Sequence, residues 1–482
     1  MGTGTYYIRV CRYNGAGSYS LKYTFTRCSV SNDPEPNNDY EHSSQLVSGT
    51  TVQGRLGYRT SDNVTDYDDW YKIVVPEEGH VELVATTTAT ATENLMLSTN
   101  SSQVYGFKNN STYYRGSISA SGYSSDTITY LATDMGAGTY YIRINRYNGC
   151  GGYRLYYKFT PCSLGADPEP NNDYEHSSLL ESGKTAQGRL GHRTSDDVTD
   201  YEDWYKIVLP EEGKIELIVT ATENLRLSTS SSQVCGFKNN STYSRGTISA
   251  SGYSSDTITY QATDMGKGTY YIRINRYSGS GGYKLYYKFT PCPLKNDFEP
   301  DDDYQHYNRL LNGRATEGRL GYRTSDDVTD YNDWYRIVVP KDGPIDITVT
   351  ATENLTFSTT SSQIYSVKAD GTLGSYEYIS GSGYGNAVIT YQKDNKAAGT
   401  YYIRINRYSG SGGYTITYNG PVSDIPGDVD GDGEVNIGDI SDITDYLLNG
   451  DPMNPLPNGD ADGDGQITIA DITAIIDKLL GN

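Results

Sequence analysis

The sequence is poor in several residue types, and each shortage excludes a class of protein. Its 482 residues include only 39 Lys and Arg against 60 Asp and Glu, which leaves a net charge of −21. Such an acidic chain is not expected to bind nucleic acid or an anionic membrane surface, because both carry negative charge. No apolar run approaches the about 20 residues of a transmembrane helix, so no transmembrane segment is expected.

Residues and motifs of catalytic sites are scarce as well. There are 5 His, and the sequence contains no Gly-x-Ser-x-Gly, His-Glu-x-x-His or phosphate-binding loop motif. His42, His176 and His306 occupy equivalent positions, but none has a second histidine at metal-ligand spacing, which favours surface histidines over a zinc site. We therefore expect that this chain is not itself an enzyme.

The six cysteines do not define a disulfide framework. Three are equivalent in the repeats described below and three each stand in a different place: Cys28, Cys162 and Cys292, then Cys11, Cys150 and Cys235. In a hairpin of residues 140–159, Cys150 lies at the turn and Cys162 beyond the far end, too distant for a bridge. Export to an oxidising compartment therefore stays open, but no pairing follows.

What the sequence does contain is a long repeat rich in tyrosine and glycine, with 48 Tyr and 52 Gly. The triplet Asp-Trp-Tyr begins at Asp69, Asp203 and Asp333, with spacings of 134 and 130 residues. An acidic Glu-Pro opener recurs at the same spacings. Periods of about 130 residues exceed those of solenoid units and are long enough for separate domains.

These repeats set the expected domain boundaries. We expect β-sandwich repeats at residues 32–162, 166–292 and 296–419, a remnant of a truncated repeat at residues 1–28, a linker at residues 420–425, and a different domain at residues 426–482. The phrase Met-Gly-x-Gly-Thr-Tyr-Tyr-Ile-Arg begins at Met1, Met135 and Met265, so Met1 aligns with a methionine inside a repeat. We therefore expect this sequence to be the C-terminal part of a longer protein, with any signal peptide or catalytic domain upstream.

Within a repeat the hydrophobic period is that of strands. Tyr140, Ile142 and Ile144 share one face, and a Gly-rich turn leads into a second strand that ends near Phe159. Further strands are expected at residues 204–209, 214–220, 225–228, 246–250 and 255–261. About eight short strands with polar turns and no helical period predict a mostly β fold of tandem antiparallel, jelly-roll-like β-sandwiches.

The character of the chain changes after residue 423. Of the 48 Tyr only Tyr446 follows, and residues 424–482 hold 13 Asp, one Glu and one Lys, or −13 of the net −21. Apolar residues now recur at helical spacing from Ile440 to Leu447 and from Ile472 to Leu479. We expect two short amphipathic helices in a small α-helical domain.

Each expected helix follows a 12-residue acidic loop of the EF-hand kind. Oxygen ligands stand at positions 1, 3, 5, 7 (a backbone carbonyl), 9 and 12: Asp428, Asp430, Asp432, Glu434, Asn436 and Asp439 in the first loop, and Asp460, Asp462, Asp464, Gln466, Thr468 and Asp471 in the second. Gly433 and Gly465 stand at position 6, where the chain turns sharply. So many carboxylates in one turn repel each other without a cation, so we expect two Ca²⁺ ions and calcium-dependent folding.

The phrases Gly-Asp-Val-Asp-Gly-Asp-Gly from residue 427 and Gly-Asp-Ala-Asp-Gly-Asp-Gly from residue 459 make residues 425–482 resemble a type I dockerin. The resemblance implies a cohesin partner on a scaffold or surface protein, in a cellulosome-like assembly at the cell surface or outside a bacterium. It also places partner-binding residues at loop positions 10 and 11, where familiar clostridial dockerins carry Ser-Thr: Ile437, Gly438, Ile469 and Ala470.

The repeat motifs Glu-Pro-Asn-Asn, Asp-x-x-Asp-Trp-Tyr and Gly-Thr-Tyr-Tyr-Ile-Arg resemble bacterial pre-peptidase C-terminal domains. These are β-sandwiches of exported proteins, and some relatives in collagenases bind collagen and hold calcium. The resemblance implies one Ca²⁺ per repeat, held by an acidic linker residue and two loop aspartates: Glu35, Asp66 and Asp69; Glu169, Asp200 and Asp203; Glu299, Asp330 and Asp333. Aspartates that cap turns are the competing interpretation.

The role of the repeats stays open between three hypotheses. The chain is either part of a secreted modular protein whose repeats bind an extracellular polysaccharide or protein matrix or act as spacers, the tail of a secreted hydrolase, or a surface stalk. Trp70, Trp204 and Trp334 are the only tryptophans, one per repeat, and are expected on the outer face of a strand. They either cover a loop or neighbouring repeat or form a stacking surface for sugar or peptide.

Overall fold

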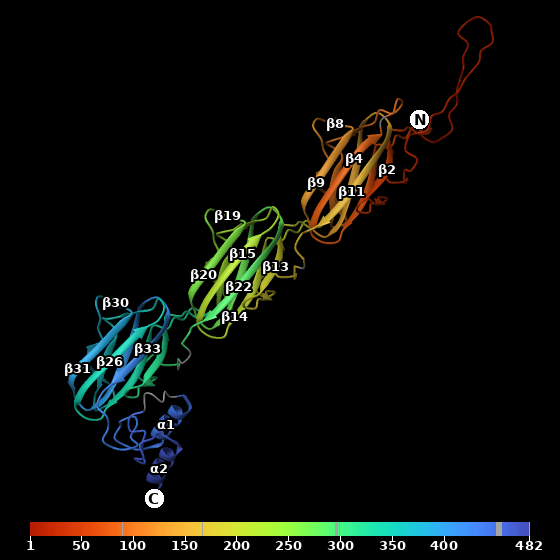
Figure 1. Cartoon of the computed structure of the whole chain (residues 1–482). Helices are drawn as coiled ribbons and strands as arrows, with labels where there is room; N and C mark the ends of the chain where they lie inside the picture. Colours follow the sequence, from red (N-terminus) through yellow and green to blue (C-terminus); the bar gives the residue numbers. More distant parts are fainter. Residues whose placement is uncertain (89, 166, 295–296, 298, 450–455, 482) are drawn as a thin grey trace.

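The computed structural model describes the chain except for residues 89, 166, 295–296, 298, 450–455 and 482. Three β-sandwiches follow one another in a row, and two helices form a small domain beyond the third (Figure 1). The predicted boundaries at residues 166, 296 and 482 lie outside the described residues. Neither helix in the described part of the chain has the length and apolar character that a bilayer span requires.

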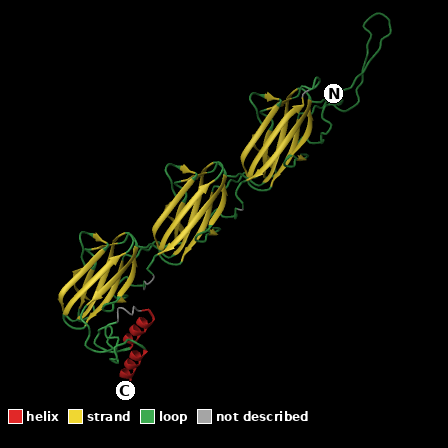
Figure 2. Ribbon diagram, viewed as in Figure 1, coloured by secondary structure: helices red, strands yellow, loops and turns green. Residues whose placement is uncertain are grey.

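Each repeat consists of two sheets (Figure 2). The first repeat has the strands β1 (Ser44–Gln45), β2 (Thr50–Leu56), β3 (Asp68–Val75), β4 (Gly79–Thr88), β5 (Met96–Ser98), β6 (Gln103–Lys108), β7 (Ser111–Ser117), β8 (Ser124–Ser125), β9 (Thr127–Met135), β10 (Gly138–Asn148) and β11 (Gly151–Pro161). One sheet has the order β1-β3-β10-β5-β8, with β6 paired to β10 and β7 to β6, and the other has the order β2-β11-β4-β9. All pairs are antiparallel except that β1 pairs parallel to β3.

The second and third repeats have the same topology. The second contains β12 (Ser178–Leu179), β13 (Thr185–Leu190), β14 (Glu202–Leu209), β15 (Gly213–Ala221), β16 (Arg226–Ser228), β17 (Gln233–Lys238), β18 (Ser241–Thr247), β19 (Ser254–Ser255), β20 (Thr257–Met265), β21 (Gly268–Ser278) and β22 (Gly281–Pro291). The third contains β23 (Asn308–Arg309), β24 (Ala315–Leu320), β25 (Asn332–Val339), β26 (Gly343–Ala351), β27 (Thr356–Ser358), β28 (Gln363–Val367), β29 (Leu373–Tyr378), β30 (Gly385–Asn386), β31 (Val388–Lys396), β32 (Gly399–Ser409) and β33 (Gly412–Asn419). The predicted β-sandwich repeats are confirmed.

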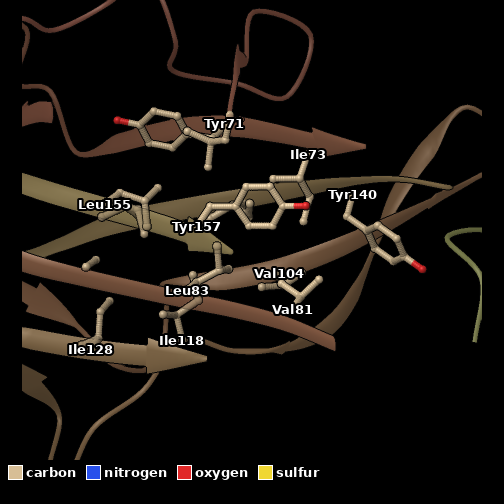
Figure 3. Close-up of a cluster of buried hydrophobic side chains, with 14 of the residues drawn as sticks. Tyr71, Ile73, Val81, Leu83, Val104, Ile118, Ile128, Tyr140, Leu155 and Tyr157 are labelled. Atoms are coloured by element: carbon tan, nitrogen blue, oxygen red, sulfur yellow. The ribbon is translucent and has the colours of Figure 1, made fainter. Parts of the chain in front are cut away.

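The core of each repeat lies between its two sheets, as the period-2 pattern predicts. In the first repeat Tyr71 of one sheet and Leu83 and Leu155 of the other are almost completely buried in one cluster (Figure 3). Buried tyrosines need hydrogen-bond partners, and here Tyr71 Oη lies 2.7 Å from Tyr153 Oη. Tyr153 Oη also donates to Asp69 Oδ2 at 2.5 Å, so the loop aspartate is tied to the core.

Consecutive repeats meet at joints that repeat the same backbone hydrogen bonds. At the first joint Gly136 N donates to Arg193 O at 2.9 Å, and Arg193 N donates to Asp134 O at 2.8 Å. At the second joint Gly266 and Arg323 make the bond that Gly136 and Arg193 make, also at 2.9 Å. Because backbone pairing rather than side chains alone joins the sandwiches, the three repeats form a defined row.

The N-terminal segment, expected to be the remnant of a truncated repeat, does not form a sheet. Residues 1–28, all of them described, form no strand. A two-stranded piece without the rest of its sheet is not stable by itself. The segment still contacts the first repeat as a preceding repeat does, because Gly2 N donates to Arg59 O at 2.6 Å and Tyr6 Oη to Arg59 O at 2.7 Å. Tyr140 Oη makes the same bond to Arg193 O at 3.0 Å.

The helical domain contains α1 (Ile437–Asn449) and α2 (Ile469–Leu480), as the helical period predicts. Its small core contains Val429, Ile443 and Ile475, and Leu311 of the third repeat belongs to the same cluster. Around this contact, Arg309 Nη2 donates to Asp442 Oδ2 at 3.0 Å and Arg314 pairs with Asp445 at 2.9 Å. The helical domain is therefore docked on the third repeat.

The third repeat has residues for this docking that the other repeats lack. At the position of Arg309 the first and second repeats carry Gln45 and Leu179. At the position of Leu311 they carry Val47 and Glu181. The contact surface is therefore a feature of the last repeat.

Candidate calcium sites

The first acidic loop gathers carboxylates at the start of α1. One oxygen each of Asp428, Asp430 and Asp439 lies within 4.8 Å of the others. Asp428 and Asp439 are fully buried, and Asp428 Oδ1 has no hydrogen-bond partner among the described residues. Unpaired buried carboxylate oxygens are costly unless a cation binds them, so this donor set fits Ca²⁺.

Hydrogen bonds from backbone N–H groups to carboxylates hold this loop in shape. Gly433 has φ 89°, a left-handed conformation that favours glycine, and its N–H donates to Asp428 Oδ2 at 3.1 Å. Asp439 accepts from Val429 N at 2.7 Å and from Asn436 N at 2.8 Å, which ties position 12 back to positions 2 and 9. The loop is therefore organised around the point where the carboxylates converge.

The second loop repeats this arrangement before α2. Oxygens of Asp460, Asp462 and Asp464 lie within 4.8 Å of one another, and Asp460 Oδ1 is a buried oxygen without a hydrogen-bond partner in the described part of the chain. Asp471 is fully buried and accepts from Ala461 N at 2.8 Å and Thr468 N at 2.7 Å. The two loops thus offer similar sites, although position 12 completes the converging group in the first loop and position 5 completes it in the second.

The remaining predicted ligands make other contacts in this structure. Asp432 is exposed, and its Oδ1 accepts from Glu434 N at 2.9 Å. Asn436 Oδ1 accepts from Gly438 N at 2.6 Å, and Thr468 Oγ1 accepts from Ala470 N at 3.0 Å. The residues at loop position 9 therefore cap the N-termini of the two helices in this structure. The backbone carbonyls of Glu434 and Gln466 stay predicted ligands.

The positions expected to bind a partner lie on the surface of the two helices. Ile437 and Ile469 are 76% and 74% exposed, although both are large apolar side chains. One helical face continues from each: Ser441, Thr444 and Leu448 after Ile437, and Thr473, Ile476 and Leu480 after Ile469. The two faces are related by a shift of 32 residues, and Ala470 is exposed while Gly438 is half-buried beside Arg309.

Each β-sandwich repeat also gathers carboxylates, at the end that faces the preceding repeat. In the second repeat, oxygens of Asp167, Glu169, Asp200 and Asp203 lie within 4.8 Å of one another. Asp203 is fully buried, and one oxygen of Asp200 and one of Asp203 have no hydrogen-bond partner in the described chain. The other oxygen of Asp203 accepts from Tyr283 Oη.

The carboxyl groups of this cluster have raised pKa values. Burial, together with the neighbouring carboxylates of Glu169 and Asp167, raises the pKa of Asp200 to about 8. Burial raises the pKa of Asp203 well above its usual range, and Asp200 adds to this effect. A divalent cation reverses this repulsion, so the donor set fits Ca²⁺ better than turn-capping alone does.

The other two repeats present the same cluster with variations. In the first repeat Asp33, Glu35 and Asp66 converge, while in the third Glu299, Asp301 and Asp333 do. Burial raises the pKa of Asp66 to about 8 and that of Asp330 to about 9, again with help from neighbouring carboxylates. Asp69 is fully buried beside Asp66.

The sequence prediction missed some of these donors. Asp33 and Asp167 lie two residues before the predicted linker glutamates, and Asp301 stands where the first two repeats carry Asn37 and Asn171. The sequence did contain a signal for the linker aspartates, since Asp33, Asp167 and Asp297 recur at the repeat spacings of 134 and 130 residues. What the sequence could not show is that linker and loop meet in space.

The tryptophans cover loops. Trp204 is 7% exposed, with the ring of Tyr174 at a centroid distance of 6.4 Å and the Arg273 guanidinium 5.6 Å from its ring centroid. Tyr174 comes from the segment before β12. His176 Nδ1 lies 2.8 Å from Asp173 Oδ1 on the surface, in keeping with a structural histidine.

The cysteines are free, and all six lie in the described part of the chain.

Comparisons with known proteins bear on both parts of the chain. No curated protein sequence matches it significantly. Among solved structures it is similar to the pre-peptidase C-terminal domain of collagenase from Bacillus anthracis, at 20% identity over 26% of this chain and 100% of that one, with a TM-score of 0.19. It is also similar to the PBSX exported protein XepA, at 11% identity over 51% of this chain and 88% of that one, with a TM-score of 0.15.

The family model that matches is described as "Dockerin type I domain", over residues 426–480. This match covers both acidic loops and both helices. Dockerins bind Ca²⁺, have cohesins as partners and occur in extracellular or cell-surface proteins. The chain therefore carries a type I dockerin at residues 426–480.

Proposed function

We propose that this chain is a non-catalytic part of a secreted bacterial protein, anchored through its dockerin to a cohesin of a cellulosome-like or cell-surface complex. The observation that carries the proposal is the matched dockerin with two loops, in each of which a buried carboxylate oxygen lacks a hydrogen-bond partner among the described residues. Each loop holds one Ca²⁺ ion, and these ions hold α1 and α2 in place for the partner.

The cohesin contacts the exposed apolar residues that begin the two helices. Ile437 and Ile469 are the most exposed of these, and Gly438 and Ala470 follow them. Large apolar side chains at such exposure mark a binding surface when they continue along a helix face. Leu448 and Leu480, 76% and 70% exposed, continue both faces.

The β-sandwich repeats act as spacers that hold the dockerin away from the rest of the protein. This role is supported by the two joints, which make the same backbone hydrogen bonds and keep the three sandwiches in a row. One Ca²⁺ ion in each repeat neutralises the carboxylates that face the joint. The alternatives are that the repeats bind collagen, cellulose or xylan, which the pull-down below separates from spacing, and that the chain is the tail of a secreted hydrolase.

The test measures binding of the full chain to a panel of cohesins by calorimetry, with Ca²⁺ and with EGTA. We expect binding to at least one cohesin in Ca²⁺, its loss in EGTA, and at least about tenfold weaker binding of the double variant Ile437→Asp and Ile469→Asp. Val208→Asp, at an exposed residue of the second repeat, is the control that leaves binding unchanged. Binding that is unaffected by EGTA and by the two substitutions refutes the proposal. Pull-down on collagen, cellulose and xylan tests the spacer role.

A further inference from the structure

The carboxylate cluster of the third repeat differs from the other two clusters at one buried position. Asp301 stands there, where the first and second repeats carry Asn37 and Asn171. The backbone places all three residues alike, because the carbonyl oxygen of each accepts from the backbone N–H of the tryptophan of its repeat, at 2.7 Å in the first two repeats and 2.9 Å in the third. A carboxylate therefore replaces an amide at an equivalent point of the fold.

The side chain of Asp301 belongs to the converging group of the third repeat. It is 1% exposed, and oxygens of Glu299, Asp301 and Asp333 all lie within 4.8 Å of one another. Oxygen ligands lie about 2.3–2.6 Å from Ca²⁺, so two ligands of one ion are at most about 5 Å apart. These three oxygens therefore meet the distance requirement for sharing one ion.

A neighbouring side chain determines which oxygen of Asp301 faces an ion. Asn308 Nδ2 donates to Asp301 Oδ2 at 2.8 Å, whereas Asp301 Oδ1 is buried and has no hydrogen-bond partner among the described residues. Asn308 stands where the first and second repeats carry Ser44 and Ser178. The third repeat thus combines two replacements, one that supplies a carboxylate and one that orients it.

The protein supplies no cation for this added charge within the part of the chain that the structure describes. The arginine at this end of the repeat, Arg319, is paired with Glu212 at 3.0 Å and with Asp297 at 3.5 Å, and not with Asp301. One oxygen of Asp333 is also buried without a hydrogen-bond partner there. Buried carboxylates in this condition are costly unless a bound cation compensates them.

The second repeat provides the comparison, because its cluster keeps the amide. Asn171 is fully buried, and neither the oxygen nor the nitrogen of its side chain has a hydrogen-bond partner in the described chain. An amide oxygen at this position is a neutral donor, whereas the carboxylate of Asp301 is anionic. The affinity of an oxygen site for Ca²⁺ depends on how many of its ligands are charged.

We propose that Asp301 makes the calcium site of the third repeat at least about tenfold stronger than that of the second repeat. This inference rests on the Ca²⁺ ion proposed above for each repeat. Asp301 binds the ion through Oδ1, and Asn308 is a positioning residue that keeps Oδ2 turned away from it. The third repeat therefore fills first as calcium rises and empties last as calcium falls, so the sandwich on which the dockerin is docked keeps its ion longest.

The test measures calcium binding at each repeat separately in the full chain. Each repeat contains one tryptophan and the dockerin contains none. Trp70→Phe with Trp334→Phe therefore leaves Trp204 to report on the second repeat, and Trp70→Phe with Trp204→Phe leaves Trp334 to report on the third. When tryptophan fluorescence is followed over buffered free Ca²⁺ concentrations, the midpoint at Trp334 should lie at least about tenfold lower than the midpoint at Trp204.

Two substitutions in the chain that keeps Trp334 separate the role of Asp301 from a general effect of charge. Asp301→Asn should raise the midpoint to about that of the second repeat. The control Asp302→Asn removes a charge at the next residue, which is exposed and lies outside the converging group, and should leave the midpoint nearly unchanged. Both substitutions install the asparagine that the other repeats carry, so the fold is expected to survive.

The reciprocal change is made in the chain that keeps Trp204. Asn171→Asp with Ser178→Asn builds the arrangement of the third repeat in the second and should lower its midpoint. Equal midpoints of the two repeats in the starting chains, or equal shifts from Asp301→Asn and Asp302→Asn, overturn this inference while leaving calcium binding by the repeats intact. A lack of any calcium response at both tryptophans overturns calcium binding by the repeats as well.

Discussion

Arg309 of the third repeat donates a hydrogen bond to Asp442 of helix α1, with Nη2 3.0 Å from Oδ2. The same guanidinium bonds Asp430, at position 3 of the first calcium loop. One side chain of a β-sandwich thus contacts both the calcium loop and the helix that follows it. The dockerin is held by the third repeat, and this contact leads to the first prediction.

Replacing the docking residues by those of the second repeat should release the dockerin. The double variant Arg309→Leu and Leu311→Glu introduces the residues found at Leu179 and Glu181, so the sandwich itself should tolerate it. It removes an ion pair and places a charge in the small apolar cluster, which opposes docking. Limited proteolysis should cut the linker at residues 420–425 faster.

The matched control for this variant is Gln45→Leu with Val47→Glu in the first repeat, at the equivalent positions. That control should leave the cleavage rate of the linker unchanged. An unchanged rate in the third-repeat variant would show that the contact does not hold the dockerin.

Removing calcium should unfold the dockerin helices. Without the ion, the buried Oδ1 atoms of Asp428 and Asp460 have neither a cation nor a hydrogen-bond partner among the described residues, so EGTA should sharply raise amide hydrogen exchange in α1 and α2. Peptides from β10 and β21 are followed in the same experiment, because they report how far calcium removal affects the sandwiches themselves. Unaltered protection of both helices in EGTA would contradict a calcium-dependent fold.

Neutralising the buried loop aspartates should remove calcium-dependent stability from the sandwiches. Calcium at about a hundred times its Kd stabilises a folded domain by about 2.7 kcal/mol, or on the order of 10 °C in Tm. The triple variant Asp69→Asn, Asp203→Asn and Asp333→Asn should lose most of this shift in a thermal melt. In EGTA the triple variant should have a higher Tm than the parent chain, because it no longer buries these three carboxyl groups beside other carboxylates.

Asp126→Asn with Asp256→Asn is the control for that triple variant. Both carboxylates are exposed and belong to none of the converging groups among the described residues. The control should keep the full calcium-dependent shift. If parent and triple variant respond alike to calcium, the repeats do not bind it through these aspartates.

Adding a methyl group at Gly136 should loosen the first joint. A Cβ there would lie 2.7 Å from the backbone nitrogen of Thr194 in the next repeat, closer than such contacts occur. The sandwich itself accepts alanine, since the third repeat carries Ala397 at this position. Gly136→Ala should therefore leave the Tm of the repeats nearly unchanged while small-angle scattering shows bending between the first two.

Gly266→Ala is the matched variant at the second joint, where a Cβ would also lie 2.7 Å from the backbone nitrogen of the next repeat's loop, at Thr324. Both substitutions should increase bending to a similar extent, and their effects should add in the double variant. A scattering profile identical to that of the parent chain would argue against rigid joints.

Glu377 gives the third repeat an acid-sensitive contact. Burial opposes its charge, but hydrogen bonds from Lys396 and Lys393 outweigh burial and lower its pKa to about 2. A lowered folded-state pKa contributes stability above the unfolded value, near 4.5, and this contribution disappears as the pH falls toward about 2. The Tm difference between the parent chain and Glu377→Gln should therefore be largest above about pH 5.

The difference should shrink steadily on acidification and vanish only below about pH 2, where Glu377 is protonated in the folded state as well. Because both proteins share all other carboxyls, the difference isolates this contact. A difference that is independent of pH would exclude the ion pair as its cause.

The sequence by itself determined whatever is encoded over short distances. Ligand spacing within 12 residues identified both calcium loops, and the period of apolar residues identified α1, α2 and the strands that carry Tyr140 and Tyr153. Local spacing suffices there because a loop or a strand fixes the direction of its own side chains. Duplication revealed the repeats, including the aspartates Asp200 and Asp203.

Tertiary structure decided which distant residues meet. It brought Asp167 of the linker to the loop of Asp200, placed Arg309 against Asp430, and joined Gly136 of one repeat to Arg193 of the next. None of these pairs has a fixed sequence spacing that signals contact, because the chain between them crosses turns and whole strands. Their proximity follows from how sheets pack and how sandwiches stack, which the order of residues specifies only through the complete fold.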